Sequence, residues 1–142
     1  MPSSPSKRIL VVDDTADNLF LMEMVLQTQE YEVEVADSGQ VALAKIEAEP
    51  FDLVLLDVVM PGMNGIEVAR RIRQNRNLSS MSIIMLTGSS LLSEDDEFDE
   101  IETDGFICKP VELKILLSRV SAILATKDRT TKAIEYQRLA SR

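Results

Sequence analysis

The chain has 142 residues, enough for one domain with a hydrophobic core, and its 45% apolar content excludes a wholly disordered protein. Its apolar runs are too short to span a membrane, and a net charge of −9 argues against direct nucleic-acid binding, which needs Lys and Arg. The absence of histidine excludes His-based catalysis and His–metal sites, while a single cysteine fits a reducing, cytoplasmic setting. Residues 1–7, rich in Pro and Ser, are predicted to be a flexible N-terminal segment without an export signal.

Short apolar runs alternate with longer segments of helical periodicity along the chain. The first half is predicted to contain, in order, strand Ile9–Val12, helix Thr15–Gln29, strand Tyr31–Ala36, helix Ser38–Glu49 and strand Leu53–Leu56. Continuous apolar runs are typical of buried parallel strands, but Tyr31–Ala36 alternates valine with glutamate. This strand should therefore have one wet face and lie at an edge of the sheet. Ser38 is the expected N-cap of the helix that follows.

The second half is predicted to contain helix Asn64–Asn75, strand Ile83–Leu86, helix Leu91–Glu102, strand Phe106–Cys108 and helix Val111–Leu124. The fourth helix has a thin apolar stripe, and eight of the eleven residues 94–104 are acidic. We expect it to be short, irregular or mobile, with an acidic face that is either solvated or a docking surface for a basic partner. Residues 126–142 are predicted to be a tail or linker, either frayed or continuing the last helix.

Five strand–helix pairs predict the α/β class, as a (βα)₅ chain over residues 8–125. Parallel strands need right-handed helical crossovers, so the expected architecture is a doubly wound, five-stranded parallel sheet with helices on both faces. Ligands of such sheets collect at the carboxyl ends of the strands. Functional residues are therefore expected directly after the apolar runs.

Polar residues follow four of the five predicted strands in the order Asp13 and Asp14, Asp57, Thr87 and Lys109. Three carboxylates crowded at one edge would repel, since a pair about 4 Å apart costs about 4 kcal/mol at an effective dielectric of about 20. A divalent cation relieves this repulsion, and oxygen ligands without His or Cys favour Mg²⁺.

The same set of residues suits phosphoryl transfer. One carboxylate oxygen can attack phosphorus while the Thr87 hydroxyl and the Lys109 ammonium bind its equatorial oxygens. Asp57 is the preferred nucleophile because it stands alone on a central strand, whereas Asp13 and Asp14 form a natural metal pair.

Four segments closely resemble receiver domains of two-component response regulators, including the chemotaxis type: Val11–Asp14, Leu55–Gly65, Met85–Gly88 and Phe106–Pro110. The resemblance covers roughly residues 7–124 and implies a flavodoxin-like strand order of 2-1-3-4-5. It also implies that Asp57 accepts a phosphoryl group from the phosphohistidine of a histidine kinase or phosphotransfer protein, in a Mg²⁺-dependent reaction followed by slow autodephosphorylation. Such a domain is a signalling phosphoacceptor rather than an enzyme.

Individual roles follow from the same resemblance. The implied metal ligands are Asp14 directly, Asp13 mainly through water, Asp57, and Val59 through its backbone carbonyl. Thr87 and Lys109 would hold the phosphoryl group, and Phe106 would be the switch aromatic that turns inward when Thr87 moves. The alternative for Phe106 is plain core filling. The Lys109–Pro110 bond is expected to be cis.

Several alternatives remain open from sequence. The chain is either a single-domain regulator that contacts a downstream protein or a piece of a longer protein with an output domain, and a homodimer is not excluded. A haloacid-dehalogenase-like Mg²⁺ phosphohydrolase would need a second acid after Asp57, where Val58-Val59 stand. An unphosphorylated interaction module usually lacks part of the acid pair or the lysine, and neither is missing. A dinucleotide-binding domain lacks support, because Asp13–Ala16 replaces the Gly-rich turn.

Overall fold

The computed structural model describes residues 6–88 and 102–140, with side chains described up to residue 126. Its elements are β1 (Arg8–Val12), α1 (Ala16–Gln27), β2 (Glu32–Ala36), α2 (Gly39–Ala48), β3 (Leu53–Asp57), α3 (Gly65–Gln74), β4 (Ser82–Thr87), β5 (Gly105–Cys108) and α4 (Leu113–Ala140). The strands pair in parallel in the order β2-β1-β3-β4-β5, which confirms the predicted doubly wound α/β fold. The predicted helix Leu91–Glu102 lies, except for its last residue, outside the described residues.

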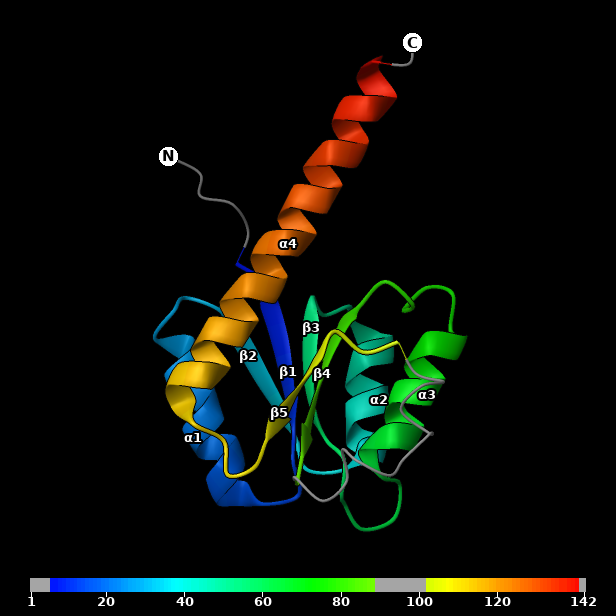
Figure 1. Cartoon of the computed structure of the whole chain (residues 1–142). Coiled ribbons are helices and arrows are strands. Elements are labelled where there is room, and N and C mark those ends of the chain that lie inside the picture. Colours follow the sequence, from blue (N-terminus) through cyan, green and yellow to red (C-terminus); the bar gives the residue numbers. More distant parts are fainter. Residues whose placement is uncertain (1–5, 89–101, 141–142) are drawn as a thin grey trace.

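The sheet separates two helical layers, with α2 and α3 on one face and α1 and α4 on the other (Figure 1). Alternate residues of each central strand enter opposite layers. Leu10, Val54 and Ile83 contribute to the α2/α3 core, whereas their neighbours Ile9, Leu55 and Ile84 contribute to the α1/α4 core. Burial on both faces explains why these strands are continuous apolar runs, and each such side chain adds about 2 kcal/mol of hydrophobic stabilisation.

The strand β2 lies at an edge of the sheet, as its alternating sequence predicted. Val33 and Val35 pack against the α1/α4 core. Glu34 instead accepts hydrogen bonds from Arg8 Nη2 at 2.7 Å and from Lys45 Nζ at 3.4 Å. The glutamates therefore place charge along the exposed edge, where it disfavours pairing with another strand.

The helix ends follow local signals where the sequence supplies them. The Ser38 hydroxyl accepts a hydrogen bond from Val41 N at 3.2 Å, which confirms the predicted N-cap of α2. The last helix follows one of the two courses left open by the sequence: α4 continues through residues 126–140 to Ala140 and extends well beyond the body of the domain (Figure 1). Among the helices of the described chain, none combines the length and apolar content needed to cross a membrane.

Two glycines shape the connection from β3 to α3. Gly62, which follows Pro61, has φ of 75°, a conformation that glycine adopts easily. Gly65 N donates to Val58 O at 2.9 Å. A Cβ on Gly65 would overlap the carbonyl oxygen of Asp57. Only a residue without a side chain lets α3 begin this close to the end of β3.

We predict that Gly65→Ala lowers the free energy of unfolding by about 2 kcal/mol, because α3 or the end of β3 must shift to admit the methyl group. Gly88→Ala is the matched control, since a Cβ there meets nothing within 4 Å. Its effect should stay below about 0.5 kcal/mol. Urea unfolding followed by circular dichroism measures both, and equal effects would contradict the close approach.

Candidate functional site

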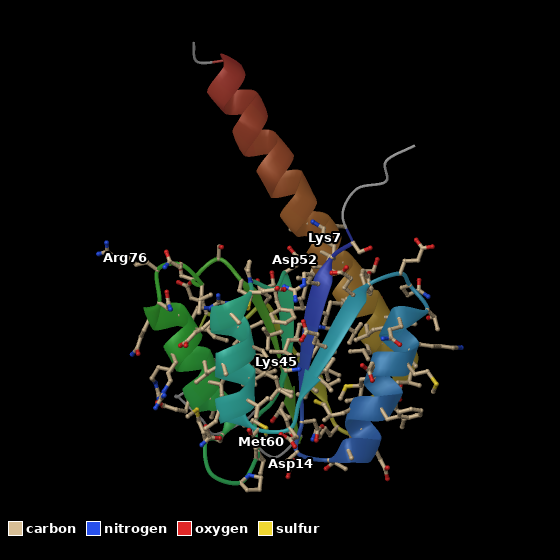
Figure 2. All side chains as sticks on the ribbon, turned by 180° about the vertical axis from the view of Figure 1, so that it is seen from behind. Lys7, Asp14, Lys45, Asp52, Met60 and Arg76 are labelled. Atoms are coloured by element: carbon tan, nitrogen blue, oxygen red, sulfur yellow. The ribbon has the colours of Figure 1, made fainter. Side chains whose placement is uncertain are left out.

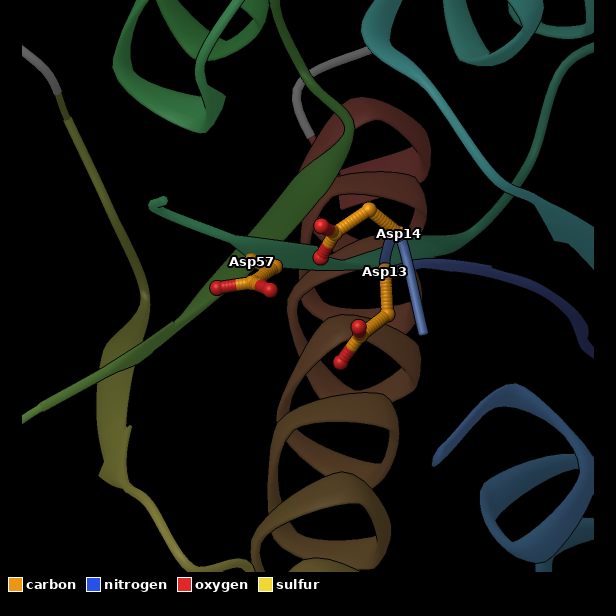
Figure 3. Close-up of side chains that lie close together, drawn as sticks. All are labelled: Asp13, Asp14 and Asp57. Carbon is orange, nitrogen blue, oxygen red and sulfur yellow. The ribbon is translucent and has the colours of Figure 1, made fainter. Parts of the chain in front are cut away.

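Three carboxylates meet at the carboxyl end of the sheet, where Figure 3 shows them turned toward a shared space. Asp57 ends β3, and Asp13 and Asp14 follow β1 directly. The strands β1 and β3 are paired neighbours, so their ends deliver these acids side by side. One carboxylate oxygen from each lies within 4.8 Å of the others. The structure thus brings together the three acids predicted from the sequence.

Asp13 and Asp14 are held in different ways although they are adjacent. Asp13 is fully buried, and its Oδ1 accepts from Thr15 N at 2.9 Å while its Oδ2 accepts from Asn18 Nδ2 at 3.3 Å. Asp14 is exposed, and its carboxylate accepts no hydrogen bond from the described residues. Asp13 therefore has a fixed orientation, whereas the oxygens of Asp14 remain available to a ligand. The contribution of Asn18 was not predicted, although its place in the first turn of α1 was a signal.

Lys109, which follows β5, supplies the positive charge at this site. Its Nζ donates to Asp57 Oδ2 at 2.7 Å and to Asp13 Oδ2 at 3.4 Å. Its backbone N donates to Thr87 O at 2.8 Å, which ties the β5 end to β4. The following bond to Pro110 is cis, as expected. The lysine predicted from the fifth strand end therefore contacts two of the three acids.

The charges at the site do not balance. Burial raises the pKa of Asp57, and the negative charge of Asp13 adds to this effect, while the hydrogen bond and charge of Lys109 oppose it. For Lys109, burial lowers the pKa, but the hydrogen bonds and charges of Asp57 and Asp13 outweigh burial and leave the pKa raised. One ammonium thus faces three carboxylates, which leaves an excess of negative charge near buried groups.

This donor set fits a hard divalent cation such as Mg²⁺. Its side-chain ligands are carboxylate oxygens, with neither sulfur nor imidazole among them. A cation would offset the negative excess that Lys109 alone leaves uncompensated. Val59, the fourth predicted ligand, follows closely in the chain, and its backbone N donates to Asp57 Oδ1 at 3.2 Å. A pocket of about 330 Å³ lies next to the acids, between α1 and the start of α4, and is lined partly by Asp13 and Lys109.

The two predicted switch residues lie on neighbouring strands. Thr87 ends β4 and is buried, and its hydroxyl donates to Gly88 O at 3.1 Å. Phe106 lies on β5 opposite Met85 of β4, half-buried against the α2/α3 core. Their roles in switching stay predictions.

Comparison with known proteins agrees with this geometry. The family model for the response regulator receiver domain matches residues 9–121. A CheY-like response regulator receiver domain protein from Methanospirillum hungatei has a TM-score of 0.81 and 34% identity, covering 89% of this chain and 99% of that one. The chemotaxis response regulator CheY4 of Vibrio cholerae has a TM-score of 0.79 and 30% identity, covering 84% and 99%.

Relatives found by sequence are longer proteins. The transcriptional regulatory protein ResD of Bacillus subtilis is 37% identical over 131 residues, which are 92% of this chain and 53% of ResD. A probable cyclic di-GMP phosphodiesterase of Vibrio cholerae is 40% identical over 119 residues, or 84% of this chain and 27% of that protein. This chain thus spans about a quarter to a half of these curated relatives.

The raised pKa of Asp57 determines how the free energy of unfolding of the metal-free protein depends on pH. Between its unfolded pKa of 3.8 and the higher folded pKa, the folded state binds more protons than the unfolded state. The stability from protonation is therefore present below pH 3.8 and lost as pH rises through the folded pKa. We predict that Asp57→Asn, measured in a chelator at pH 7, raises the free energy of unfolding, because the amide removes a charge that the folded state disfavours. Lys109 keeps its contact with Asp13 in this variant.

The control for this measurement is Asp37→Asn, which changes an exposed acid outside the cluster. Its free energy of unfolding should stay within about 0.5 kcal/mol of the parent value. Urea unfolding at several pH values measures both variants. A loss of stability in Asp57→Asn at pH 7 would show that the ion pair outweighs burial and repulsion.

Proposed function

This chain belongs to the response regulator receiver domain family, and on that premise we propose that residues 8–125 form a receiver unit whose phosphoacceptor is Asp57. The donor would be the phosphohistidine of a histidine kinase or phosphotransfer protein, in a Mg²⁺-dependent reaction in the cytoplasm. One observation carries the proposal: a buried carboxylate at the end of a central strand lies 2.7 Å from the Lys109 ammonium and beside two further acids.

The proposed chemistry is a single phosphoryl transfer. An oxygen of ionised Asp57 attacks phosphorus, so that a P–O bond forms while the P–N bond to the donor imidazole breaks. Lys109 favours the ionised carboxylate and stays charged, which lets it neutralise the arriving phosphoryl oxygens. Bound Mg²⁺ would supply further neutralisation of the carboxylates and the phosphoryl oxygens. Slow hydrolysis of the acyl phosphate would reset the site.

Four groups are proposed to hold the metal: the carboxylates of Asp13, Asp14 and Asp57 and the backbone carbonyl of Val59. Asp14 is the best candidate for direct binding, because its carboxylate is exposed and unpaired among the described residues. Asp13 already accepts hydrogen bonds at both oxygens, which fits a role mainly through water. Val59 is 64% exposed beside the site, where it would influence the access of water.

The proposed switch starts at Thr87. Its hydroxyl donates to Gly88 O, so it must leave that bond to donate to a phosphoryl group on Asp57. The space that Thr87 vacates would let Phe106 turn further inward from its half-buried position. Phe106 has no hydroxyl, so it would signal through packing alone to a downstream protein or output domain.

We predict that Asp57→Asn abolishes labelling by acetyl phosphate with Mg²⁺, because the amide cannot act as the nucleophile. Intact-mass spectrometry measures the loss, and Asp37→Asn should label as the parent does. Full labelling of Asp57→Asn would show that another residue is the nucleophile.

A second prediction concerns the metal alone. Asp14→Ala should weaken Mg²⁺ binding at least about 10-fold, because it removes the most accessible carboxylate of the cluster. Isothermal titration calorimetry measures the affinity without any phosphoryl donor. Asp17→Ala removes an exposed acid of α1 and should leave it unchanged. Equal affinities of Asp14→Ala and the parent would contradict the proposed metal site.

A further inference from the structure

The strand β5 is the least supported strand that bears residues of the site. It has four residues, lies at the edge opposite β2 and, within residues 6–88 and 102–140, pairs with β4 alone. It carries Phe106 and leads directly to Lys109. A backbone hydrogen bond contributes only about 1 kcal/mol net, so the position of so short a strand depends strongly on how its two ends are held. At the carboxyl end, Lys109 contacts Asp57 and Asp13.

At the amino end, Asp104 fastens β5 to β4. Its backbone N donates to Ile83 O at 2.7 Å, and its Oδ2 accepts from Ile83 N at 2.7 Å. Both backbone groups of Ile83 are thus satisfied by one residue, just before the ladder begins with Ile84 opposite Gly105. Asp104 therefore fixes where the β4–β5 pairing starts.

Arg73, in the last turn of α3, reaches this junction from the α2/α3 side of the sheet. Its guanidinium donates to Ser79 O at 2.8 Å, Met81 O at 2.6 Å, Glu102 O at 2.7 Å and Asp104 Oδ2 at 3.4 Å. One side chain thus joins three segments: α3, the loop before β4 and the residues before β5. A planar guanidinium with five donors can make this junction, whereas an ammonium lacks its fixed fork.

The burial of Arg73 separates it from the other arginines of α3. Its side chain is only 15% exposed, and burial lowers its pKa while the charges of Asp104 and Glu102 oppose that effect. Arg70 and Arg71 instead pair with Glu67 of the same helix, at more exposed positions. Burying a guanidinium is costly unless its donors are satisfied. Two of the contacts that offset this cost for Arg73, to Glu102 O and Asp104 Oδ2, hold the start of β5.

We propose that Arg73 is a positioning residue for the phosphoacceptor site. Arg73 fixes the start of β5 against α3 and β4. Lys109 follows Asp104 by five residues, which is about 16 Å of extended chain, so the position of this start determines where Lys109 can reach Asp57. The inference rests on the proposed function of that site. Charged groups then hold β5 at both ends. If the contact between Lys109 and Asp57 changes at one end, Arg73 still holds the other end in place.

The first test is amide hydrogen exchange of Arg73→Gln, which shortens the reach and removes the charge. Exchange of the β5 amides should become about 10-fold faster relative to those of β1 and β3, because the hydrogen bonds of Arg73 hold the segments before β4 and β5 and not those strands. Arg71→Gln is the matched control, since it changes an arginine of the same turn whose partner is local. It should leave the exchange of β5 unchanged.

The second test measures beryllofluoride, a phosphoryl analogue, binding with Mg²⁺ by fluorine NMR. Arg73→Gln should weaken binding about 3- to 10-fold, since Lys109 is less well placed, and Arg73→Lys should recover part of the loss. Asp104→Ala should have a similar effect that does not add to that of Arg73→Gln, because both remove one junction.

Two results would overturn the inference. Uniformly faster exchange in every strand, in proportion to a lower free energy of unfolding, would show that Arg73 supports the whole fold instead. Unchanged beryllofluoride affinity in Arg73→Gln would show that the junction does not position Lys109. If the parent protein fails to bind beryllofluoride, the proposed function is contradicted, and the exchange comparison alone then decides whether Arg73 anchors β5.

Discussion

Repulsion among Asp13, Asp14 and Asp57 is the constraint that organises the carboxyl edge of this sheet, because parallel strands β1 and β3 must deliver the three acids to one place. Two features of the fold stabilise this arrangement: the buried strands hold the acids in place, and a neighbouring ammonium neutralises part of their charge. Rigid support comes from strands that are buried on both faces, so the acids cannot move apart without disturbing two cores. Lys109 provides the neutralisation but leaves a negative excess. That excess fits a hard cation.

The firmly held and the adjustable parts of the molecule lie on different strands. The central strands β1, β3 and β4 have neighbours on both sides and carry the acids and Thr87. The edge strand β5 has one neighbour and carries Phe106 and the approach to Lys109. Asp57 therefore lies on a well-supported strand and contacts Lys109, the residue that follows a lightly held one. Such a division lets a local change of charge alter surface packing while the core stays intact.

Much of the fold and the acid cluster could be predicted because both depend on local sequence. Continuous apolar runs predicted the central strands, and alternating valine and glutamate predicted that Tyr31–Ala36 lies at an edge. Because ligands of such sheets bind at the carboxyl ends of the strands, the residues there, Asp13, Asp57 and Lys109, were predicted to lie together. The Arg73–Asp104 contact could not be predicted, since it joins residues 31 apart whose meeting depends on how α3 packs. The length of α4 was left open because the apolar period that marks its first turns fades after Leu124.

Because α4 is long, a small tilt at its base would displace its far end by a much larger distance. Its 28 residues make a rod about 42 Å long, anchored by Leu116, Val120 and Leu124 in the core beside α1. The rest of the helix has left the body of the domain (Figure 1), whereas Asp14 and Met60 mark the opposite, carboxyl edge of the sheet (Figure 2). A tilt of about 5° at the base would displace the far tip by roughly 4 Å. The helix thus acts as a lever, and anything attached to it would feel sub-ångström repacking at its root as a movement several times larger.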